Sequence, residues 1–130
     1  MQPSIFTKII NRELPGYIID ETDDFIAFLD VFPLAKGHTL VIPKKQVDYI
    51  FDLDATTYQH LWSFAQQVAV KVEKAIPCQR VGVAVIGLEV PHAHIHLIPL
   101  QSVEDINFSR PKLNLTKEEM EETLRQIKNK

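Results

Sequence analysis

Three of the five histidines in this 130-residue chain, His92, His94 and His96, occupy alternate positions in one short segment. Successive side chains of an extended strand point to opposite faces, so this spacing places the three imidazoles on one face. The small and apolar residues between them then point to the other face, where they pack. Because several polar rings in a row are costly to bury, the pattern indicates chemistry rather than packing.

Nucleophilic catalysis uses every member of such a row. A neutral imidazole near pH 7 can attack phosphorus without a cofactor. The attacking nitrogen must be unprotonated, and the opposite ring nitrogen should donate to a fixed acceptor. Neighbouring imidazoles can supply positive charge to a phosphate and a proton to the leaving group. His94 has a histidine on each side, so we expect it to be the nucleophile.

Metal binding is the alternative chemistry. Same-face residues on a strand stand roughly 6.5–7 Å apart, whereas zinc–nitrogen bonds measure about 2.0–2.1 Å. His94 and His96 could therefore share an ion with His38, but His92 is too far from His96 to join them. No Asp or Glu is interleaved with the histidines. A metal-dependent hydrolase using these residues stays an alternative, and we expect no required cofactor and no metal.

Composition limits the other functions. With 45% hydrophobic and 24% charged residues, the chain fits one globular domain. A formal net charge of −3 lacks the basic field that drives nonspecific nucleic-acid binding. The single cysteine, Cys78, excludes an internal disulfide. No stretch approaches the roughly 20 apolar residues of a membrane span, and no signal peptide is readable. We therefore expect a cytoplasmic protein with neither nucleic acid nor membrane as a partner.

Hydrophobic periodicity predicts strands, a helix, strands and a second helix. A long helix ends at Pro77, and a capping box at Thr116 begins a charged helix over about 116–128. The nearly all-apolar run 81–86 predicts a central strand. The fold class is α+β, with a five-stranded, mainly antiparallel sheet in a single domain over 1–130 and a motif-bearing core at about 4–100. The strands are predicted at 17–20, 25–30, 38–42, 81–86 and 92–100.

The segment 92–98, His-Ala-His-Ile-His-Leu-Ile, resembles the histidine-triad (HIT) pattern of three histidines alternating with apolar residues. The resemblance extends to Ser4–Ile10 with Leu14-Pro15, to Phe28–Val31 and to Gly37–Lys44. These segments follow one another in the order and spacing that the family shows, over most of residues 4–100.

This resemblance implies a HIT-like five-stranded fold, a homodimer, and hydrolysis or transfer of nucleotides. It implies that His94 attacks the α-phosphorus of a nucleoside phosphoramidate or dinucleoside polyphosphate, giving a nucleotidyl-histidine intermediate that water cleaves. His96 would contact the phosphate or the leaving group. His92 would hold the geometry through its backbone carbonyl, and His38 would lie beside them.

The resemblance also implies a nucleoside pocket for a purine nucleotide or nucleotide conjugate. The carboxylate of Asp30 would accept hydrogen bonds from the ribose hydroxyls, although an Asp that caps a turn is the simpler explanation. Apolar side chains would sandwich the base, although a place in the core explains them equally well. These are Phe6, Ile9, Leu14, Phe28, Leu29, Val31 and Leu40.

One segment departs from the family pattern. Many members carry a longer polar loop before the triad, whereas Gly87–Pro91 is short and contains no Gln, Ser or Thr. Phosphate binding would then depend on the imidazoles and on backbone N–H groups, with Gly87 permitting close approach. Glu89 is unexpected beside an anionic substrate. This departure motivates a third hypothesis, a non-catalytic purine-nucleotide-binding module.

Overall fold

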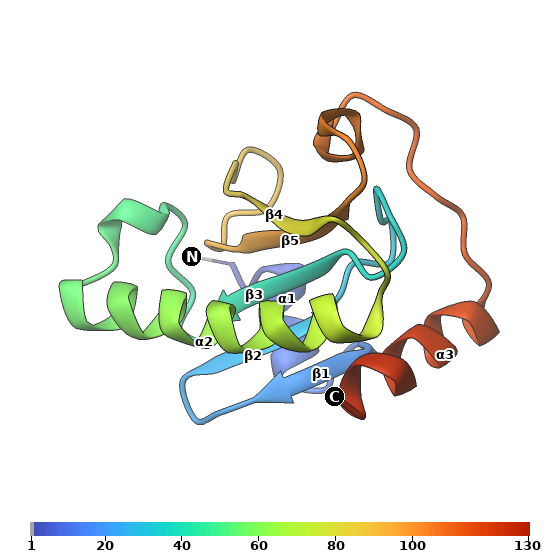
Figure 1. Ribbon diagram of the computed structural model, residues 1–130. Helices are drawn as coiled ribbons and strands as arrows, with labels where there is room; N and C mark the ends of the chain where they lie inside the picture. The colour runs from blue at the N-terminus through green and yellow to red at the C-terminus, as the bar shows by residue number, and fades with distance from the viewer. Residues whose placement is uncertain (1) are drawn as a thin grey trace.

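The computed structural model describes residues 2–130 and has one five-stranded sheet at its centre (Figure 1). The strand order is β1-β2-β3-β5-β4, and every neighbouring pair is antiparallel. The predicted α+β class with a five-stranded antiparallel sheet is confirmed. The strands are β1 (Ile18–Glu21), β2 (Phe25–Leu29), β3 (Thr39–Pro43), β4 (Arg80–Ala84) and β5 (Ile95–Leu100).

Three α-helices begin at residues whose side chains cap them. Ser4 caps α1 (Ile5–Ile10), and Asp54 caps α2 (Ala55–Ala75). Thr116 and Glu119 form a capping box at the start of α3 (Lys117–Lys128). These polar side chains accept hydrogen bonds from backbone N–H groups that have no partner within the helix. Short 3-10 helices, η1 (Ile50–Asp52) and η2 (Val103–Ile106), lie in the connections.

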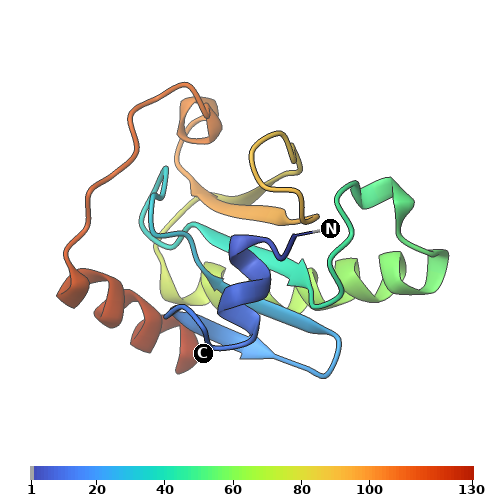
Figure 2. The ribbon, with the colours of Figure 1, turned by 180° about the vertical axis from the view of Figure 1, so that it is seen from behind.

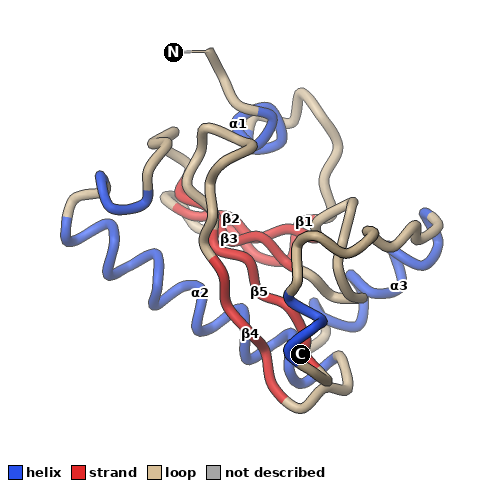
Figure 3. Tube along the Cα trace, turned by 90° about the horizontal axis from the view of Figure 1, so that it is seen from above, coloured by secondary structure: helices blue, strands red, loops and turns tan. Residues whose placement is uncertain are grey.

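The sheet lies between α1 on one face and α2 on the other (Figure 3). Alternation along β2 and β3 explains why both faces are buried: Ala27 and Val41 pack on the α2 side, while Phe28 and Leu40 pack on the α1 side with Phe6. Helix α3 packs against α2 and β1. Of the helices in the described part of the chain, none has the length and apolar character of a membrane span.

Two strand predictions need correction. The run 81–86 was expected to be central, but β4 is an edge strand and Val83 is 48% exposed. An apolar run alone does not distinguish a central strand from an edge strand. β5 begins at Ile95 rather than at His92. The backbone N–H groups of His92 and Ala93 bond to Val90 and Val47 instead of to a neighbouring strand.

The connection between β5 and α3 is a long irregular segment, which arches away from the sheet in Figure 2. A capping box between Ser102 and Asp105 fixes its start. Farther along, the N–H of Leu113 donates to the carbonyl of Pro33 at 2.8 Å. This bond ties the segment to the loop that follows β2, beside the site described next.

Candidate functional site

A cavity of about 410 Å³ opens on the α1 side of the sheet. It collects most of the side chains that the sequence singles out, from α1, from the ends of β2 and β3, and from β5. Of the predicted site residues, eleven line it: Phe6, Ile9, Phe28, Leu29, Asp30, Val31, His38, Leu40, Gly87, His94 and His96.

His94 is held in one tautomer by the backbone. Its Nδ1 atom lies 2.7 Å from the carbonyl oxygen of His92. A carbonyl only accepts, so Nδ1 carries the proton and Nε2 keeps a free lone pair. Within residues 2–130, Trp62 Nε1 is the one buried side-chain polar atom without a hydrogen-bond partner. The Nε2 atom of His94 has no hydrogen-bond partner either, but it is not among the buried atoms. It is therefore accessible, and His94 lines the cavity.

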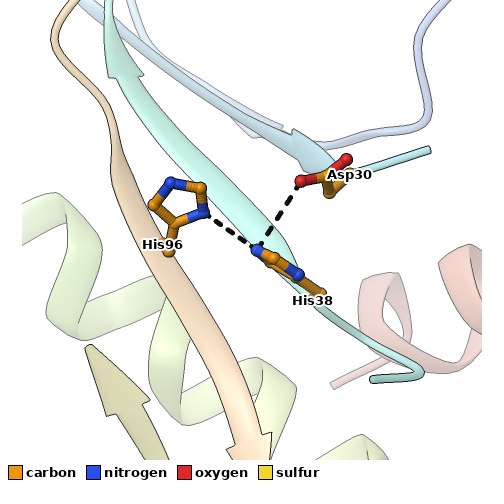
Figure 4. Close-up of side chains that lie close together, drawn as sticks. All are labelled: Asp30, His38 and His96. Atoms are coloured by element: carbon orange, nitrogen blue, oxygen red, sulfur yellow. Dashed lines mark hydrogen bonds and ion pairs between the residues drawn. The ribbon is translucent and has the colours of Figure 1, made fainter. Parts of the chain in front are cut away.

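The His38 and His96 rings form a directed pair (Figure 4). The backbone N–H of Leu34 donates to Nδ1 of His38 at 3.0 Å. Nε2 of His38 must then carry the proton, and it donates to Nδ1 of His96 at 2.9 Å. His96 consequently carries its own proton on Nε2. That atom has no partner in the described residues and is not buried, so an N–H donor faces the cavity beside the nucleophile.

Burial keeps these rings neutral. It lowers the pKa of His38 to about 4, and the nearby positive charge of Lys112 contributes. Burial likewise lowers the pKa of His96 to about 3, with smaller contributions from the neighbouring imidazoles and Lys112. The pKa of His94 is also lowered by burial. Near pH 7 all three rings are therefore uncharged, as the tautomers above require.

Asp30 both caps a turn and borders the cavity. Its Oδ1 atom accepts a hydrogen bond from the N–H of Phe32 at 2.9 Å. Its Oδ2 atom lies 3.6 Å from Nε2 of His38 (Figure 4). Burial raises the pKa of this carboxyl, while the Phe32 N–H partly offsets the rise. The turn-capping explanation is thus correct for one oxygen, and the other can still accept from a ligand.

His92 is fully buried and does not line the cavity. Its Nε2–H donates to the carbonyl of Pro43 at 2.7 Å. Its Nδ1 atom therefore accepts, and the hydroxyl of Ser4 donates to it at 2.7 Å. The ring anchors the segment whose carbonyl orients His94.

Gln46 ties α1 to this segment. Its Oε1 atom accepts from the N–H of Ser4 at 2.8 Å and from the hydroxyl of Thr7 at 2.9 Å. Its Nε2 atom donates to the carbonyl of Pro91 at 3.2 Å. The position of α1 is thereby coupled to the triad, and its Phe6 ring meets the His94 ring edge-on at 5.0 Å. Gln46 has no motif of its own, so its role was not predicted from the sequence.

A possible metal cluster differs from the set that the sequence suggested. Asp30, His38 and His96 offer ligand atoms within 4.8 Å of one another, so Asp30 takes the place of His94. A metal on Nε2 of His38 would have to displace the proton held there. That proton could not move to Nδ1, because the Leu34 N–H already occupies that nitrogen. The donor set thus fits a hydrogen-bond relay better than a metal ion.

Of the apolar residues predicted to hold a base, all but Leu14 line the cavity. Phe6, Phe28 and Leu40 are buried, while Val31 is 53% exposed at the rim. Leu14 is 37% exposed and lies outside the cavity lining. The backbone N–H groups of residues 13 and 14 both bond to Lys8 in the turn after α1, and Pro15 and Gly16 line the cavity instead.

The short segment before the triad also borders the cavity. Gly87 has φ +74°, a conformation that favours glycine, and an added Cβ would meet no atom within 4 Å. Its role in the structure is therefore conformational. Glu89 lines the cavity too, and its charge acts to raise the pKa of His94 against the larger effect of burial.

Two further cavity residues were not anticipated. The Phe108 ring meets the His96 ring edge-on at 4.8 Å and the His38 ring at 6.2 Å. Lys112 donates from Nζ to the Phe108 carbonyl at 2.9 Å and lies 5.6 Å from the Phe108 ring centroid. Both belong to the irregular segment after β5, where no periodicity or motif marks a residue as functional.

Comparisons with known proteins agree with this architecture. A HIT-like protein of Borreliella burgdorferi is 35% identical over 135 residues, covering 98% of this chain and 97% of that protein. An adenosine 5'-monophosphoramidase of Saccharomyces cerevisiae is 35% identical over 100 residues, covering 73% of this chain and 61% of that protein.

The fold has equally clear counterparts. The crystal structure of a Hit-like protein from Bartonella henselae superposes with a TM-score of 0.83 at 33% identity, covering 97% of this chain and 95% of that one. The model of the HIT domain family matches residues 11–103, a span that includes His38 and all three histidines of the triad. The chain therefore belongs to the HIT family.

Proposed function

We propose that this chain cleaves nucleotides at the α-phosphate through a nucleotidyl intermediate on His94. The observation that carries the proposal is the fixed tautomer of His94, whose accessible Nε2 lone pair borders a cavity with Asp30 at its rim. The substrates are nucleoside phosphoramidates or dinucleoside polyphosphates. The name of the yeast relative, an adenosine 5'-monophosphoramidase, supports the phosphoramidate class.

In the first step, Nε2 of His94 attacks the α-phosphorus and a phosphorus–nitrogen bond forms. The bond from phosphorus to the leaving group breaks, and its electron pair leaves with that group, which takes up a proton from solvent in the cavity. The Nε2–H of His96 donates a hydrogen bond to the phosphoryl or leaving-group oxygen or nitrogen. The carbonyl of His92 accepts from Nδ1 and stabilises the positive charge that develops on the His94 ring.

In the second step, water attacks the same phosphorus, the bond to Nε2 breaks, and the proton that the water loses passes to solvent. The nucleoside monophosphate leaves, and His94 regains its lone pair. An alcohol or phosphate in place of water would give transfer rather than hydrolysis. Throughout, Asp30 accepts from the ribose hydroxyls, and the apolar walls hold a purine base.

No metal enters this scheme. The relay from Leu34 through His38 to His96 uses the same nitrogens that a metal would need. Turnover is therefore expected to persist in a chelator. Loss of activity on chelation, with recovery on added zinc, would support the metal-dependent alternative instead.

The test is the variant His94→Asn, assayed with adenosine 5'-phosphoramidate. Turnover should fall by at least about a thousandfold, in line with the loss of a covalent nucleophile, while AMP still binds. The control variant is His60→Asn, which alters an exposed histidine on α2. With a slow substrate, wild type should accumulate a covalent adduct that adds the mass of one AMP group and that acid cleaves. Mass spectrometry after quenching detects this adduct. Wild type that binds AMP but turns over nothing would support a binding module only.

We also propose that two copies associate through β4 and the neighbouring aromatic surface. β4 is an edge strand with exposed Val83. Exposed Tyr49 and Phe51 line a cavity of about 330 Å³ together with His94 and with residues 85 and 86, which directly follow β4. Unpaired edge strands and apolar patches favour association. Sedimentation should give the mass of a dimer for wild type and of a monomer for Val83→Arg. A monomeric wild type would contradict the proposal.

A further inference from the structure

The charges around the cavity are poorly matched to an anionic ligand if Lys112 is ignored. Besides histidines, the ionisable side chains that line the cavity in the described part of the chain are Asp30, Glu89 and Lys112. The α-phosphate of a bound nucleotide carries at least one negative charge at pH 7. Because burial holds His38 and His96 neutral, those rings offer the phosphate no full positive charge. Among the described residues that line the cavity, Lys112 is therefore the one that carries a full positive charge.

The ammonium group of Lys112 is free to bind a ligand. One of its three N–H donors is used by the carbonyl of Phe108, 2.9 Å from Nζ. Within residues 2–130, no carboxylate oxygen lies within 4.0 Å of Nζ. Two donors therefore remain for oxygen atoms of a ligand in the cavity.

The segment that carries Lys112 is fixed on both sides. Before it, the guanidinium of Arg110 donates to the carbonyl of Glu104 at 2.8 Å. After it, Leu113 is bonded to Pro33. Two residues before Arg110, the Phe108 ring packs edge-on against His96. The ammonium group is thus held on the His96 side of the cavity, and it needs little ordering when a ligand arrives.

We propose that Lys112 binds the phosphate of the nucleotide, together with the Nε2–H of His96. The segment after β5 would thereby supply the phosphate contact that the short loop 87–91 cannot make with side chains. The inference rests on the proposed function, since it takes the ligand to be a nucleotide. It adds a residue that confers preference for phosphorylated over unphosphorylated nucleosides.

The experiment compares AMP with adenosine, which differ in the phosphate group. Both are titrated calorimetrically into wild type and the variants Lys112→Gln, Lys112→Arg and Lys36→Gln. Lys36 is an exposed lysine outside the cavity lining and serves as the matched control. For Lys112→Gln, the AMP dissociation constant should rise about tenfold, as for loss of a charge-assisted hydrogen bond, while that of adenosine stays within about twofold.

Lys112→Arg should keep most of the AMP affinity, and Lys36→Gln should change neither ligand. The AMP affinity of Lys112→Gln should also depend less on salt than that of wild type. Unchanged AMP affinity, or equal losses for AMP and adenosine, would overturn the inference. If wild type turns over a phosphoramidate in that case, the proposed function survives. If wild type binds neither AMP nor adenosine, both the inference and the proposed function are overturned.

Discussion

The Nε2 atom of His38 lies 2.9 Å from the Nδ1 atom of His96, and the backbone N–H of Leu34 fixes the direction of the bond between them. The proton on His38 points toward His96, so His96 presents its own N–H to the cavity. His94 is set in the opposite sense, with its proton held by the His92 carbonyl and its lone pair free. Two rings two residues apart thus present a donor and a nucleophile, each fixed by a backbone group.

The pH dependence follows from the protonation state of His94. Burial lowers the pKa of this ring below its usual value of 6.5, and only the unprotonated ring can attack. We expect kcat/KM for a phosphoramidate to fall on the acid side with a midpoint below pH 6.5, after correction for ionisation of the substrate. An acid limb with its midpoint above 6.5 would contradict a buried, neutral nucleophile.

The sequence predicted on which face of the sheet His94 and His96 lie, because alternation along a strand depends only on local geometry. His94 and His96 lie as expected on the cavity side, and the alternating residues Ala93, Ile95 and Leu97 pack toward α2. The central position of 81–86 was wrong, because burial of a strand depends on which strands flank it, and that is set by the whole topology. β-branched residues form strands equally well at an edge.

Other residues were beyond prediction for a different reason. Lys112 and Phe108 reach the cavity through an irregular segment. Individual hydrogen bonds, such as that from the N–H of Leu113 to the carbonyl of Pro33, fix the path of this segment. No periodic pattern encodes such a path. Gln46 likewise acts through contacts with residues more than 38 positions away in the chain.

Substitution of Asp30 tests the nucleoside end of the cavity. In Asp30→Asn, the ribose hydroxyls lose a charged acceptor, which is worth about 1.5–3 kcal/mol. We expect the dissociation constant of AMP to rise by about 10- to 100-fold. That of 2',3'-dideoxy-AMP, which has no such hydroxyls, should change much less. Titration of both nucleotides against both proteins measures the difference. Equal losses for the two would show that Asp30 acts by capping its turn alone.

Substitution of Gln46 tests the link between α1 and the triad. Gln46→Ala leaves the buried N–H of Ser4 without its acceptor, which should cost about 1–3 kcal/mol in the free energy of unfolding. KM should also rise, because Phe6 on α1 loses its fixed position beside His94. Gln66→Ala, at an exposed position on α2, is the matched control and should stay within about 0.5 kcal/mol of wild type. Urea unfolding and steady-state kinetics give the two readouts. A Gln46 variant as stable as Gln66→Ala would contradict the link.

Substitution of Glu89 tests whether its negative charge changes kcat/KM according to the charge of the leaving group. Glu89 lines the cavity near His94, and its negative charge acts to raise the pKa of that ring. In Glu89→Gln, the acid limb of kcat/KM should therefore move to lower pH. The same change removes repulsion of anions, so kcat/KM for a dinucleoside polyphosphate should rise by about threefold or more at low salt.

A phosphoramidate with a cationic amine as its leaving group should respond in the opposite direction, because it loses an attractive partner. Glu118→Gln, on the exposed surface of α3, has the same change in net charge outside the cavity and serves as the control. If both substrates and the pH profile respond to Glu89→Gln as they do to Glu118→Gln, then Glu89 points its charge into solvent and does not select the leaving group.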